Sequence, residues 1–202
     1  MNQRNKFVKQ EKLSVELINR ERNLNQSPVV IWFTGLSGAG KTTLANGLEK
    51  RLLNNGIHSF LLDGDNVRLG LCKDLGFSAS DRKENIRRVA EVALLFFESA
   101  AVTICSFVSP FNEDRSFARG LFPEGRFFEV FVKASIEDCE IRDTKGLYQL
   151  AREGKLLEFT GVSSPYEEPE NPELIIDTTS LSVEESIEML YLMIREKIRF
   201  EH

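Results

Sequence analysis

The feature that most constrains this chain is a glycine-rich segment near residue 40. An apolar run at residues 29–34 leads into GLSGAGKTT, which begins at Gly35. The segment fits G-x-x-x-x-G-K-[ST], the pattern of a loop whose backbone N–H groups surround phosphate oxygens. β-Branched and aromatic residues before the loop predict a buried strand, and leucines at helical spacing after it predict a helix. The sequence therefore predicts a strand, a phosphate-binding loop and a helix in direct succession.

The fixed positions of this loop have separate physical tasks. Glycines allow the positive-φ path that turns the N–H groups inward. Lys41 is expected to reach the β- and γ-phosphates, and the hydroxyl of Thr42 is expected to bind Mg²⁺. The positive end of the following helix adds to the attraction. The residues predicted to hold the nucleotide here are Gly35, Leu36, Ser37, Gly38, Ala39, Gly40, Lys41, Thr42 and Thr43.

Composition limits the kinds of partner. The 202 residues carry a formal net charge of −5, which does not support a nucleic-acid surface, because proteins that bind the phosphate backbone usually show a basic footprint. No apolar stretch has the length that crossing a bilayer requires, and the first residues lack the apolar segment of a secretion signal. We therefore expect a cytoplasmic protein without nucleic-acid or membrane partners.

The same data predict a single folded domain. A chain of this length can bury one core, and no shift in composition indicates a second domain. We expect a polar, partly helical arm at residues 1–27 and one domain at residues 28–202. Cys72, Cys105 and Cys139 are scattered without metal-ligand spacing, so we expect reduced thiols.

Carboxylates follow the second predicted strand. The apolar run at residues 58–63 ends in Asp63, and Asp65 comes two residues later. In open α/β sheets ligands bind outside the carboxyl ends of the strands, so both carboxylates are placed to bind magnesium or a substrate hydroxyl. From the residues alone, a solvated turn stays open as the alternative.

Four arginines lie just beyond this strand. Ser78 and Asp81 form the pattern of a capping box ahead of an amphipathic helix, and Arg82 and Asn85 share one stripe near its positive end. Four clustered cations in a chain of negative net charge predict an anionic substrate. For Arg87 and Arg88, a solvated helix face is an equally good explanation. The four are Arg68, Arg82, Arg87 and Arg88.

The remainder of the chain continues the alternation of strands and helices. Residues 102–107, 127–132 and 174–177 read as three more buried strands. Asn112, Ser135 and Ser182 are expected to cap helices, the last of which is expected to run to the C-terminus. Five strands alternating with helices predict an α/β fold, a doubly wound five-stranded parallel sheet with helices on both faces.

One segment has a different character. Residues 145–172 mix charge, glycine and proline in a long polar excursion before the last strand. Long excursions of this kind in compact domains are often active-site lids. We therefore expect a mobile lid over the site.

Six segments between residues 29 and 177, among them LDGDNVR, the helix with DRKENIRR and FTGVSSPYEEPENPEL, resemble those of adenylylsulfate kinase (APS kinase), a family with the P-loop kinase fold. The phosphate loop alone would fit many kinases, but the DGDN-x-R run, the DRKENIRR helix and FTG followed by PYE-x-P in one order are specific to this family. The segments that carry the resemblance are GLSGAGKTTLA, LDGDNVR, DLGFSASDRKENIRRVAEVA, SFVSPFNEDR, CEIRDTKGLYQLAREG and FTGVSSPYEEPENPEL.

The resemblance implies a reaction. The family transfers the γ-phosphoryl group of ATP to the 3′-hydroxyl of adenosine 5′-phosphosulfate (APS), which gives 3′-phosphoadenosine 5′-phosphosulfate, the activated sulfate donor. It therefore implies an ATP-dependent kinase of sulfate activation, with ATP and Mg²⁺ as cofactors, APS as the small-molecule substrate and a homodimer as the assembly.

The resemblance also implies roles for individual residues. Thr42 and Asp63 would lie near magnesium, and Asp63, or otherwise Asp65, would orient or deprotonate the 3′-hydroxyl. Lys145 would close over the transferring phosphoryl group, and Arg142 would lie against the ATP base. The implied APS ligands are Arg68, Arg82 and Asn85 at the phosphosulfate and ribose, and Phe77 and Phe159 on either side of the adenine. Without the resemblance, ordinary core packing is the alternative for the two phenylalanines.

Ser109 precedes a proline and an aromatic residue, and in this family the corresponding serine is often described as a phosphorylated intermediate. In-line phosphoryl transfer needs no nucleophilic serine, so we expect Ser109 to line the site without an obligatory covalent step. The implied catalytic set is Lys41, Asp63, Ser109 and Lys145, and Asp65, Ser109 and Lys145 also belong to the implied substrate site.

The chain departs from the family pattern at several positions. Asn112 stands where arginine is usual, Thr144 replaces a common proline, Cys72 replaces a common asparagine, and Ser163 and Ser164 replace an acidic pair. None of these residues has an assigned role, but with them the lid could differ from that of the family in its mobility or in its affinity for the substrate. Two other functions stay open: a P-loop kinase for another hydroxyl, such as a sugar acid, shikimate or a nucleotide, and a catalytically silent nucleotide-binding regulator.

Overall fold

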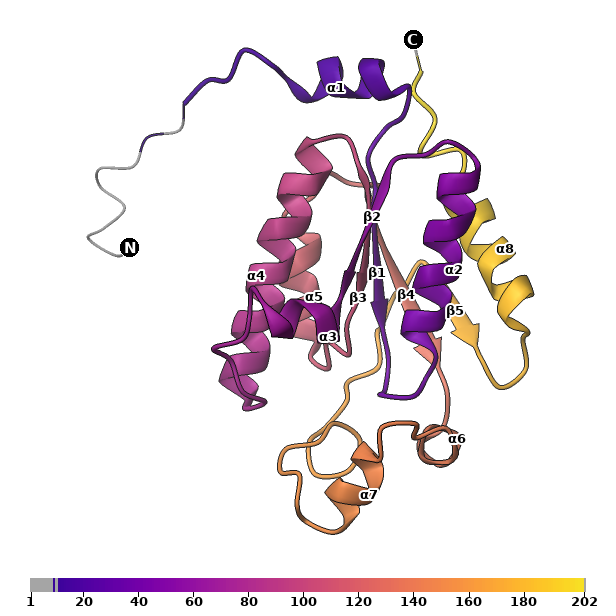
Figure 1. The fold of residues 1–202 in the computed structure, drawn as a ribbon. Helices are drawn as coiled ribbons and strands as arrows, with labels where there is room; N and C mark the ends of the chain where they lie inside the picture. The colour runs from indigo at the N-terminus through magenta and orange to yellow at the C-terminus, as the bar shows by residue number, and fades with distance from the viewer. Residues whose placement is uncertain (1–8, 10, 202) are drawn as a thin grey trace.

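A computed structural model describes residue 9 and residues 11–201 of the chain. Part of the polar arm predicted at residues 1–27 therefore lies outside the described residues. The division of the chain at residue 27 stays a prediction. Of the arm, the structure describes one helix, α1 (Leu17–Leu24), which lies across the end of the molecule opposite the phosphate loop (Figure 1).

A five-stranded sheet forms the centre of the described chain, and all of its pairings are parallel. This confirms the predicted sheet, because β1 lies in the middle and the chain winds outward from it in both directions. All five residues of β1 are buried. The strands, in the order β2-β3-β1-β4-β5, are β1 (Val30–Thr34), β2 (Ser59–Asp63), β3 (Val102–Ser106), β4 (Phe127–Lys133) and β5 (Leu174–Asp177).

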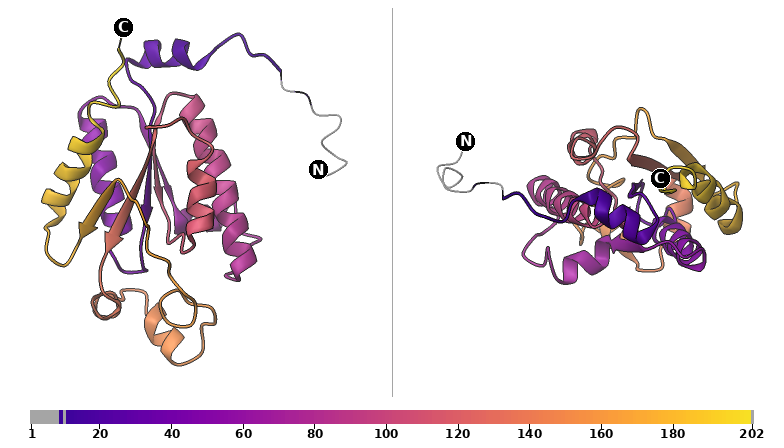
Figure 2. Two further views of the ribbon diagram at one scale, coloured as in Figure 1. Left: turned by 180° about the vertical axis from the view of Figure 1, so that it is seen from behind. Right: turned by 90° about the horizontal axis from the view of Figure 1, so that it is seen from above.

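Helices cover both faces of the sheet, as predicted (Figures 1 and 2). On one face lie α2 (Lys41–Asn54) and α8 (Val183–Ile194); on the other lie α3 (Gly64–Leu69), α4 (Ala79–Glu98) and α5 (Asn112–Arg119). Neighbouring residues of β1 point to opposite faces, so Ile31 packs in the core on the α2 side and Trp32 in the core on the α4 side.

Two short helices lie beyond the carboxyl ends of the strands. They are α6 (Ile136–Ile141) and α7 (Leu147–Arg152), and Figure 1 shows them below the sheet with the segment that leads back to β5. This is the end of a parallel sheet at which ligands bind. Residues 145–172, the predicted lid, therefore lie on the side of the phosphate loop.

Serine residues begin three of the helices as the sequence predicts. The side-chain oxygen of Ser78 accepts the N–H of Asp81, and that of Ser135 accepts the N–H of Asp138. Ser182 forms a reciprocal capping box with Glu185. Each cap satisfies a backbone N–H that the helix itself cannot pair.

Two expectations about helix ends are wrong. Asn112 does not cap α5, because Phe111 occupies the cap position and Asn112 already lies in the first turn. Its free N–H is satisfied by Glu167 Oε2 at 2.7 Å, a residue far away in the sequence. The last helix also stops at Ile194 and not at the chain end, and the turn that follows carries Ile198 into the core.

Among the described residues, none of the helices combines the length and the apolar character needed to cross a membrane.

Gln26 joins the segment before β1 to the sheet. Its side chain is fully buried and donates to the carbonyl oxygens of His58 (2.9 Å) and Ala100 (2.7 Å). Its own oxygen accepts the N–H of His58 at 2.8 Å. One amide thus pairs three backbone groups just before β2 and β3, one of which, the carbonyl oxygen of His58, also accepts the N–H of Val102 at 3.0 Å.

We expect Gln26→Ala to lower the free energy of unfolding by about 2 kcal/mol or more, since it leaves buried backbone groups unpaired. Urea denaturation followed by circular dichroism measures this. Gln149→Ala is the matched control, because Gln149 is exposed and its side chain bonds, within the described residues, to the neighbouring Glu153 alone, so a change of within about 0.5 kcal/mol is expected there. Equal stability of the two variants would contradict the role given to Gln26.

Candidate active site

The phosphate loop connects β1 to α2 and depends on glycine at its close approaches. Gly35 has φ 149°, and a Cβ atom there would lie 2.4 Å from the carbonyl oxygen of Val132. Gly38 has φ 80°, and its Cβ would lie 2.9 Å from the carbonyl oxygen of Cys139. Both contacts are with backbone, so a larger residue would displace the loop from β4 and α6. The sequence pattern therefore marks real steric limits.

Lys41 places its ammonium group inside this loop. Its Nζ donates to the carbonyl oxygens of Gly35 (3.0 Å) and Leu36 (2.7 Å), and only 8% of the residue is exposed. Burial lowers the pKa of Lys41 from 10.5 to about 8, because the charged form loses its hydration. An anion bound in the loop would stabilise the charged form of Lys41 and raise its pKa again, so the loop favours a negatively charged ligand.

Oxygen ligands gather beside the start of α2. Thr42 Oγ1 donates to Asp63 Oδ2 at 2.9 Å and lies 3.5 Å from Ser106 Oγ. Asp63, at the end of β2, also accepts the N–H groups of Asp65 (3.1 Å) and Asn66 (3.5 Å) through its other oxygen. The carboxylate is thus fixed by α3 while one oxygen faces the loop. A hydroxyl and a carboxylate in this arrangement suit a hard cation that keeps most of its water.

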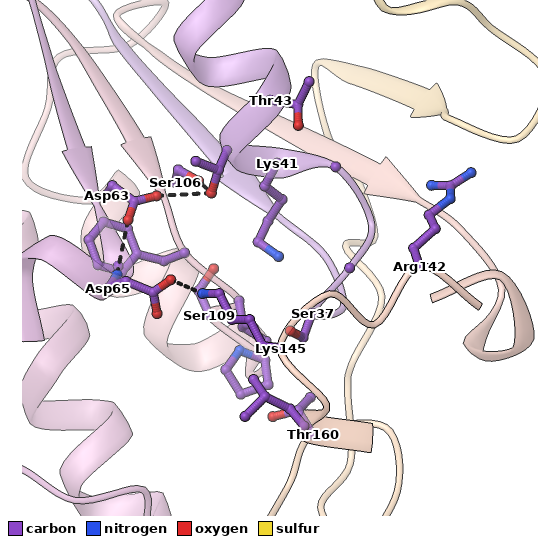
Figure 3. Close-up of a pocket in the computed structure, with 18 of the residues that line it drawn as sticks. Ser37, Lys41, Thr43, Asp63, Asp65, Ser106, Ser109, Arg142, Lys145 and Thr160 are labelled. Carbon is purple, nitrogen blue, oxygen red and sulfur yellow. Dashed lines mark hydrogen bonds and ion pairs between the residues drawn. The ribbon is translucent and has the colours of Figure 1, made fainter. Parts of the chain in front are cut away.

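The predicted lid reaches the site through Lys145. Its ammonium group pairs with the Asp65 carboxylate, and Figure 3 shows this contact between Lys145 and Asp65, which lies in the first turn of α3. Both side chains are more than half exposed. Exposed pairs of this kind contribute little stability, about 0.2–1 kcal/mol, so Lys145 can change partner when a ligand enters.

Two arginines and an aromatic ring line the opposite side. The guanidinium of Arg68 lies 4.5 Å from the centre of the Phe77 ring, and that of Arg82 lies 5.8 Å from it. Arg82 also donates to the carbonyl oxygens of Phe77 (2.9 Å) and Glu158 (2.7 Å). Burial lowers the pKa of both arginines, which stay charged because guanidinium is so basic.

Arg87 and Arg88 do not belong to this group. Arg87 donates two hydrogen bonds to Glu84, and Arg88 pairs with Glu84 and Asp74. The alternative left open in the sequence, a solvated helix face, is therefore correct for these two. Glu84 neutralises both along the helix, and Asp74, in the segment before α4, also pairs with Arg88.

Asn85 and Phe159 complete this side of the cavity. Asn85 is 4% exposed, and its side-chain oxygen has no hydrogen-bond partner in the described structure. Phe159 is buried and packs edge-on against Tyr148 with ring centres 4.9 Å apart, whereas Phe77 is half exposed. Both phenylalanines line one cavity, but Phe159 also belongs to the hydrophobic core on the α2 side of the sheet, so core packing holds for Phe159 and a place at the adenine stays a prediction for both.

Ser109 and Arg142 are held by partners of their own. Ser109 is 2% exposed, and its Oγ accepts the indole N–H of Trp32 at 3.1 Å. Arg142 donates to the hydroxyl (2.8 Å) and the carbonyl oxygen (3.0 Å) of Thr178, which follows β5. Figure 3 shows Arg142 on the far side of the loop from Ser109 and Lys145.

A single cavity of about 810 Å³ brings the predicted residues together. Three loop residues, Gly35, Leu36 and Ala39, lie outside its lining, because they form the back of the loop. The predicted residues that line it are Ser37, Gly38, Gly40, Lys41, Thr42, Thr43, Asp63, Asp65, Arg68, Phe77, Arg82, Asn85, Ser109, Arg142, Lys145 and Phe159.

Ser106, Thr160 and Thr178 are among the polar residues of the same cavity that were not predicted from the sequence. Ser106 is the last residue of β3, Thr178 follows β5, and Thr160 lies beside Phe159 with a buried hydroxyl that has no partner in the described structure. The signal that singled out Asp63, a polar residue at the carboxyl end of a strand, would also have found Ser106 and Thr178. Thr160 carried no such signal.

Comparison with known proteins agrees with this geometry. The family model for adenylylsulphate kinase matches residues 27–177. A probable adenylyl-sulfate kinase of Halalkalibacterium halodurans is 57% identical over 178 residues, which is 88% of each chain, and an adenylyl-sulfate kinase of Marinobacter nauticus is 54% identical over 89% of this chain and 92% of its own.

Among solved structures, the APS kinase of Mycobacterium tuberculosis in complex with AMPPNP and APS superimposes with a TM-score of 0.81 at 42% identity, covering 84% of this chain and 98% of its own. Sequence family, identity along most of both chains and the three-dimensional fold all agree. The chain belongs to the adenylylsulphate kinase family.

Proposed function

We infer that this chain is an ATP-dependent kinase that phosphorylates the 3′-hydroxyl of APS. The observation that carries this is the division of one cavity into two halves: a phosphate loop with Lys41 on one side, and Arg68, Arg82 and the two phenylalanines on the other. Asp63 lies where the halves meet. The chain's relatives and its P-loop kinase fold support the same reaction.

On the nucleotide side, we propose that residues 35–43 hold the phosphates of ATP and that Arg142 lies against its base. Thr42 and Asp63 would hold Mg²⁺, since a threonine hydroxyl and one carboxylate leave room for the water and phosphate oxygens that this ion prefers. When bound, Mg²⁺ supplies charge neutralisation at the β- and γ-phosphates.

On the acceptor side, Arg68 and Arg82 would bind the phosphosulfate, because guanidinium groups donate paired hydrogen bonds to such oxygens. Phe77 and Phe159 would hold the adenine between them, and the unpaired oxygen of Asn85 would accept a hydrogen bond from the ribose. These side chains line the cavity from α3, from α4 and the segment before it, and from the predicted lid, which suits a substrate with three distinct parts.

The chemistry that these residues would perform is positioning and charge stabilisation. Asp63 would orient the 3′-hydroxyl and accept its proton as the bond to phosphorus forms. Lys41 and Lys145 would face the equatorial oxygens of the transferring group, where negative charge is spread. Lys145 would leave Asp65 to do so, and the lid would thereby close over the reacting groups.

Three further points stay proposals of this kind. We propose that the chain assembles as a homodimer, as expected for the family; a relative from Thiobacillus denitrificans is described as hexameric. We also propose that residues 145–172 move as a lid. Location in the cytoplasm stays a prediction.

The first experiment is a substrate panel with purified protein, ATP and Mg²⁺. APS should yield ADP and a product phosphorylated at the 3′-hydroxyl, because the acceptor half of the cavity matches a sulfated adenylate. Turnover of shikimate or gluconate in its place would favour a kinase for another hydroxyl. Tight ATP binding without any product would favour a silent regulator. Mass spectrometry of the products distinguishes these results.

A second prediction follows from the low pKa of Lys41. Above pH 8 the free protein holds Lys41 largely neutral, and bound triphosphate favours the charged form, so nucleotide binding should take up close to one proton at pH 9. Affinity for ATP should therefore fall as the pH rises through 8. Calorimetric titration with ATP in two buffers of different ionisation enthalpy measures the uptake.

Two variants control this measurement. Lys41→Met should remove the proton uptake and lower kcat by about 10²-fold or more, because one aligned cation near the developing charge is lost. Lys50→Met changes an exposed lysine of the same helix and should leave both unchanged. Undiminished uptake in Lys41→Met would place the titrating group elsewhere.

A third prediction concerns Ser109. Its Oγ accepts a hydrogen bond from Trp32, which draws on the lone pairs that a nucleophile would use. Ser109→Ala is therefore expected to keep kcat within about tenfold, the cost of one or two hydrogen bonds. Steady-state assays with APS and ATP test this. Complete loss of turnover with normal APS binding would support a phosphoserine intermediate.

A further inference from the structure

The end of the lid segment is attached to the sheet by residues for which the sequence predicts no individual role. We call residues 165–168, PYEE, the return segment. The ring of Tyr166 stacks on Phe131 of β4 with centres 6.0 Å apart, and its hydroxyl lies 3.0 Å from Thr34 Oγ1. Thr34 is the last residue of β1, directly before the phosphate loop. The return segment therefore reaches the centre of the molecule.

Glu167 makes three hydrogen bonds to one short stretch of chain. Its N–H donates to the carbonyl oxygen of Pro110 at 2.8 Å, and its carboxylate accepts the N–H of Asn112 at 2.7 Å. Its own carbonyl oxygen accepts from Arg115 Nη2 at 2.7 Å. The carboxylate lies at the N-terminal end of α5, where negative charge is favoured, and it supplies the cap that Asn112 does not.

Arg115 links this contact to Ser109. Its guanidinium is 2% exposed and forms an ion pair with Glu129 at 2.7 Å. A second nitrogen donates to the carbonyl oxygen of Ser109 at 2.6 Å, and Nη2 also contacts the side-chain oxygen of Asn112. One buried cation thus binds both the return segment and residues 107–111, the segment after β3 that we call the Ser109 turn.

The Ser109 turn needs such support. Ser109 has φ 38°, in the left-handed region that costs a non-glycine residue about 1–2 kcal/mol. A strained conformation persists only where its surroundings over-determine it. Thr34 Oγ1 donates to the carbonyl oxygen of Val108 at 2.7 Å, and Trp32 donates to Ser109 Oγ. The bonds from Glu167 and Arg115 complete this set of contacts.

We propose that Glu167 is a positioning residue for the acceptor site: by capping α5 and binding Pro110 and Arg115, it holds Ser109 in the conformation that faces APS. The inference rests on the proposed function, because it assigns Ser109 to the APS half of the cavity. The nucleotide half lies at the other side of the loop, so the effect is specific to APS.

Steady-state kinetics with both substrates varied tests this. Glu167→Ala should raise KM for APS about fivefold, the loss of one charged hydrogen bond of about 1 kcal/mol, and leave KM for ATP within about twofold. Glu167→Gln should recover most of the loss, because its amide oxygen can still accept the N–H of Asn112. Glu168→Ala is the matched control, since Glu168 is an exposed neighbour for which the described structure shows no hydrogen bond or ion pair.

A readout without substrate separates this inference from the proposed function. Trp32 is the single tryptophan of the chain, and its indole N–H bonds to Ser109, so its fluorescence reports on the turn. Emission of Glu167→Ala should shift toward that of Ser109→Ala, and emission of Glu168→Ala should match the unaltered protein. Should the unaltered protein fail to phosphorylate APS, this shift still decides the inference.

Two results would overturn it. One is identical kinetics and emission in Glu167→Ala and Glu168→Ala, which would make Glu167 an ordinary surface residue. The other is an equal rise in KM for APS and for ATP, which would indicate a general loss of structure.

Discussion

The structure depends on a lysine ammonium group buried in a loop of glycines. Lys41 can lie there because two loop carbonyl oxygens accept hydrogen bonds from its ammonium group. The loop can adopt this path because Gly35 and Gly38 have no side chain that would hold it away from β4 and α6. A buried cation without a counter-ion is costly, as its lowered pKa records. A bound phosphate would therefore offset the free-energy cost of burying the Lys41 charge in the free loop.

That constraint also explains the arrangement of the sheet. Burying β1 on all sides fixes the point at which the loop begins, and parallel strands on either side bring their carboxyl ends to the same edge. Asp63 and Ser106 thus come within reach of Thr42 although they follow different strands. Three oxygen-bearing side chains from three segments are thus brought together by sheet topology.

The sequence predicted those parts of the molecule whose information is local. The phosphate loop, the five strands and three serine caps each depend on a few consecutive residues, and all were confirmed. Arg87 and Arg88 could not be separated from Arg68 and Arg82 by pattern, because the separation depends on which face of α4 meets the cavity. The APS-side roles came from family resemblance, since two phenylalanines far apart in sequence carry no physical signal of meeting.

The predictions failed where a residue's partner is distant in the sequence. Asn112 has the residue type of a helix cap, yet the carboxylate of Glu167 caps α5. Glu167 is more than fifty residues away in the sequence, so the residues around the start of α5 contain no signal for it. The network of Arg115, Glu129 and Glu167 was missed for the same reason. Burial of Arg115 becomes comprehensible only when all of its acceptors are seen together.

The two ends of the lid differ in a way that sets how it can move. At one end Lys145 and Asp65 form an exposed pair worth about 0.2–1 kcal/mol, which thermal motion breaks readily. At the other, the return segment is held by Tyr166 and by three hydrogen bonds of Glu167 around a buried arginine. The second end is thus held by several hydrogen bonds and the first by one exposed ion pair, so if residues 145–172 move as the lid proposed above, we expect the return segment to stay in place. Closure would then move Lys145 while the return segment stays bound to the sheet, so that the lid could cover the nucleotide without disturbing the Ser109 turn.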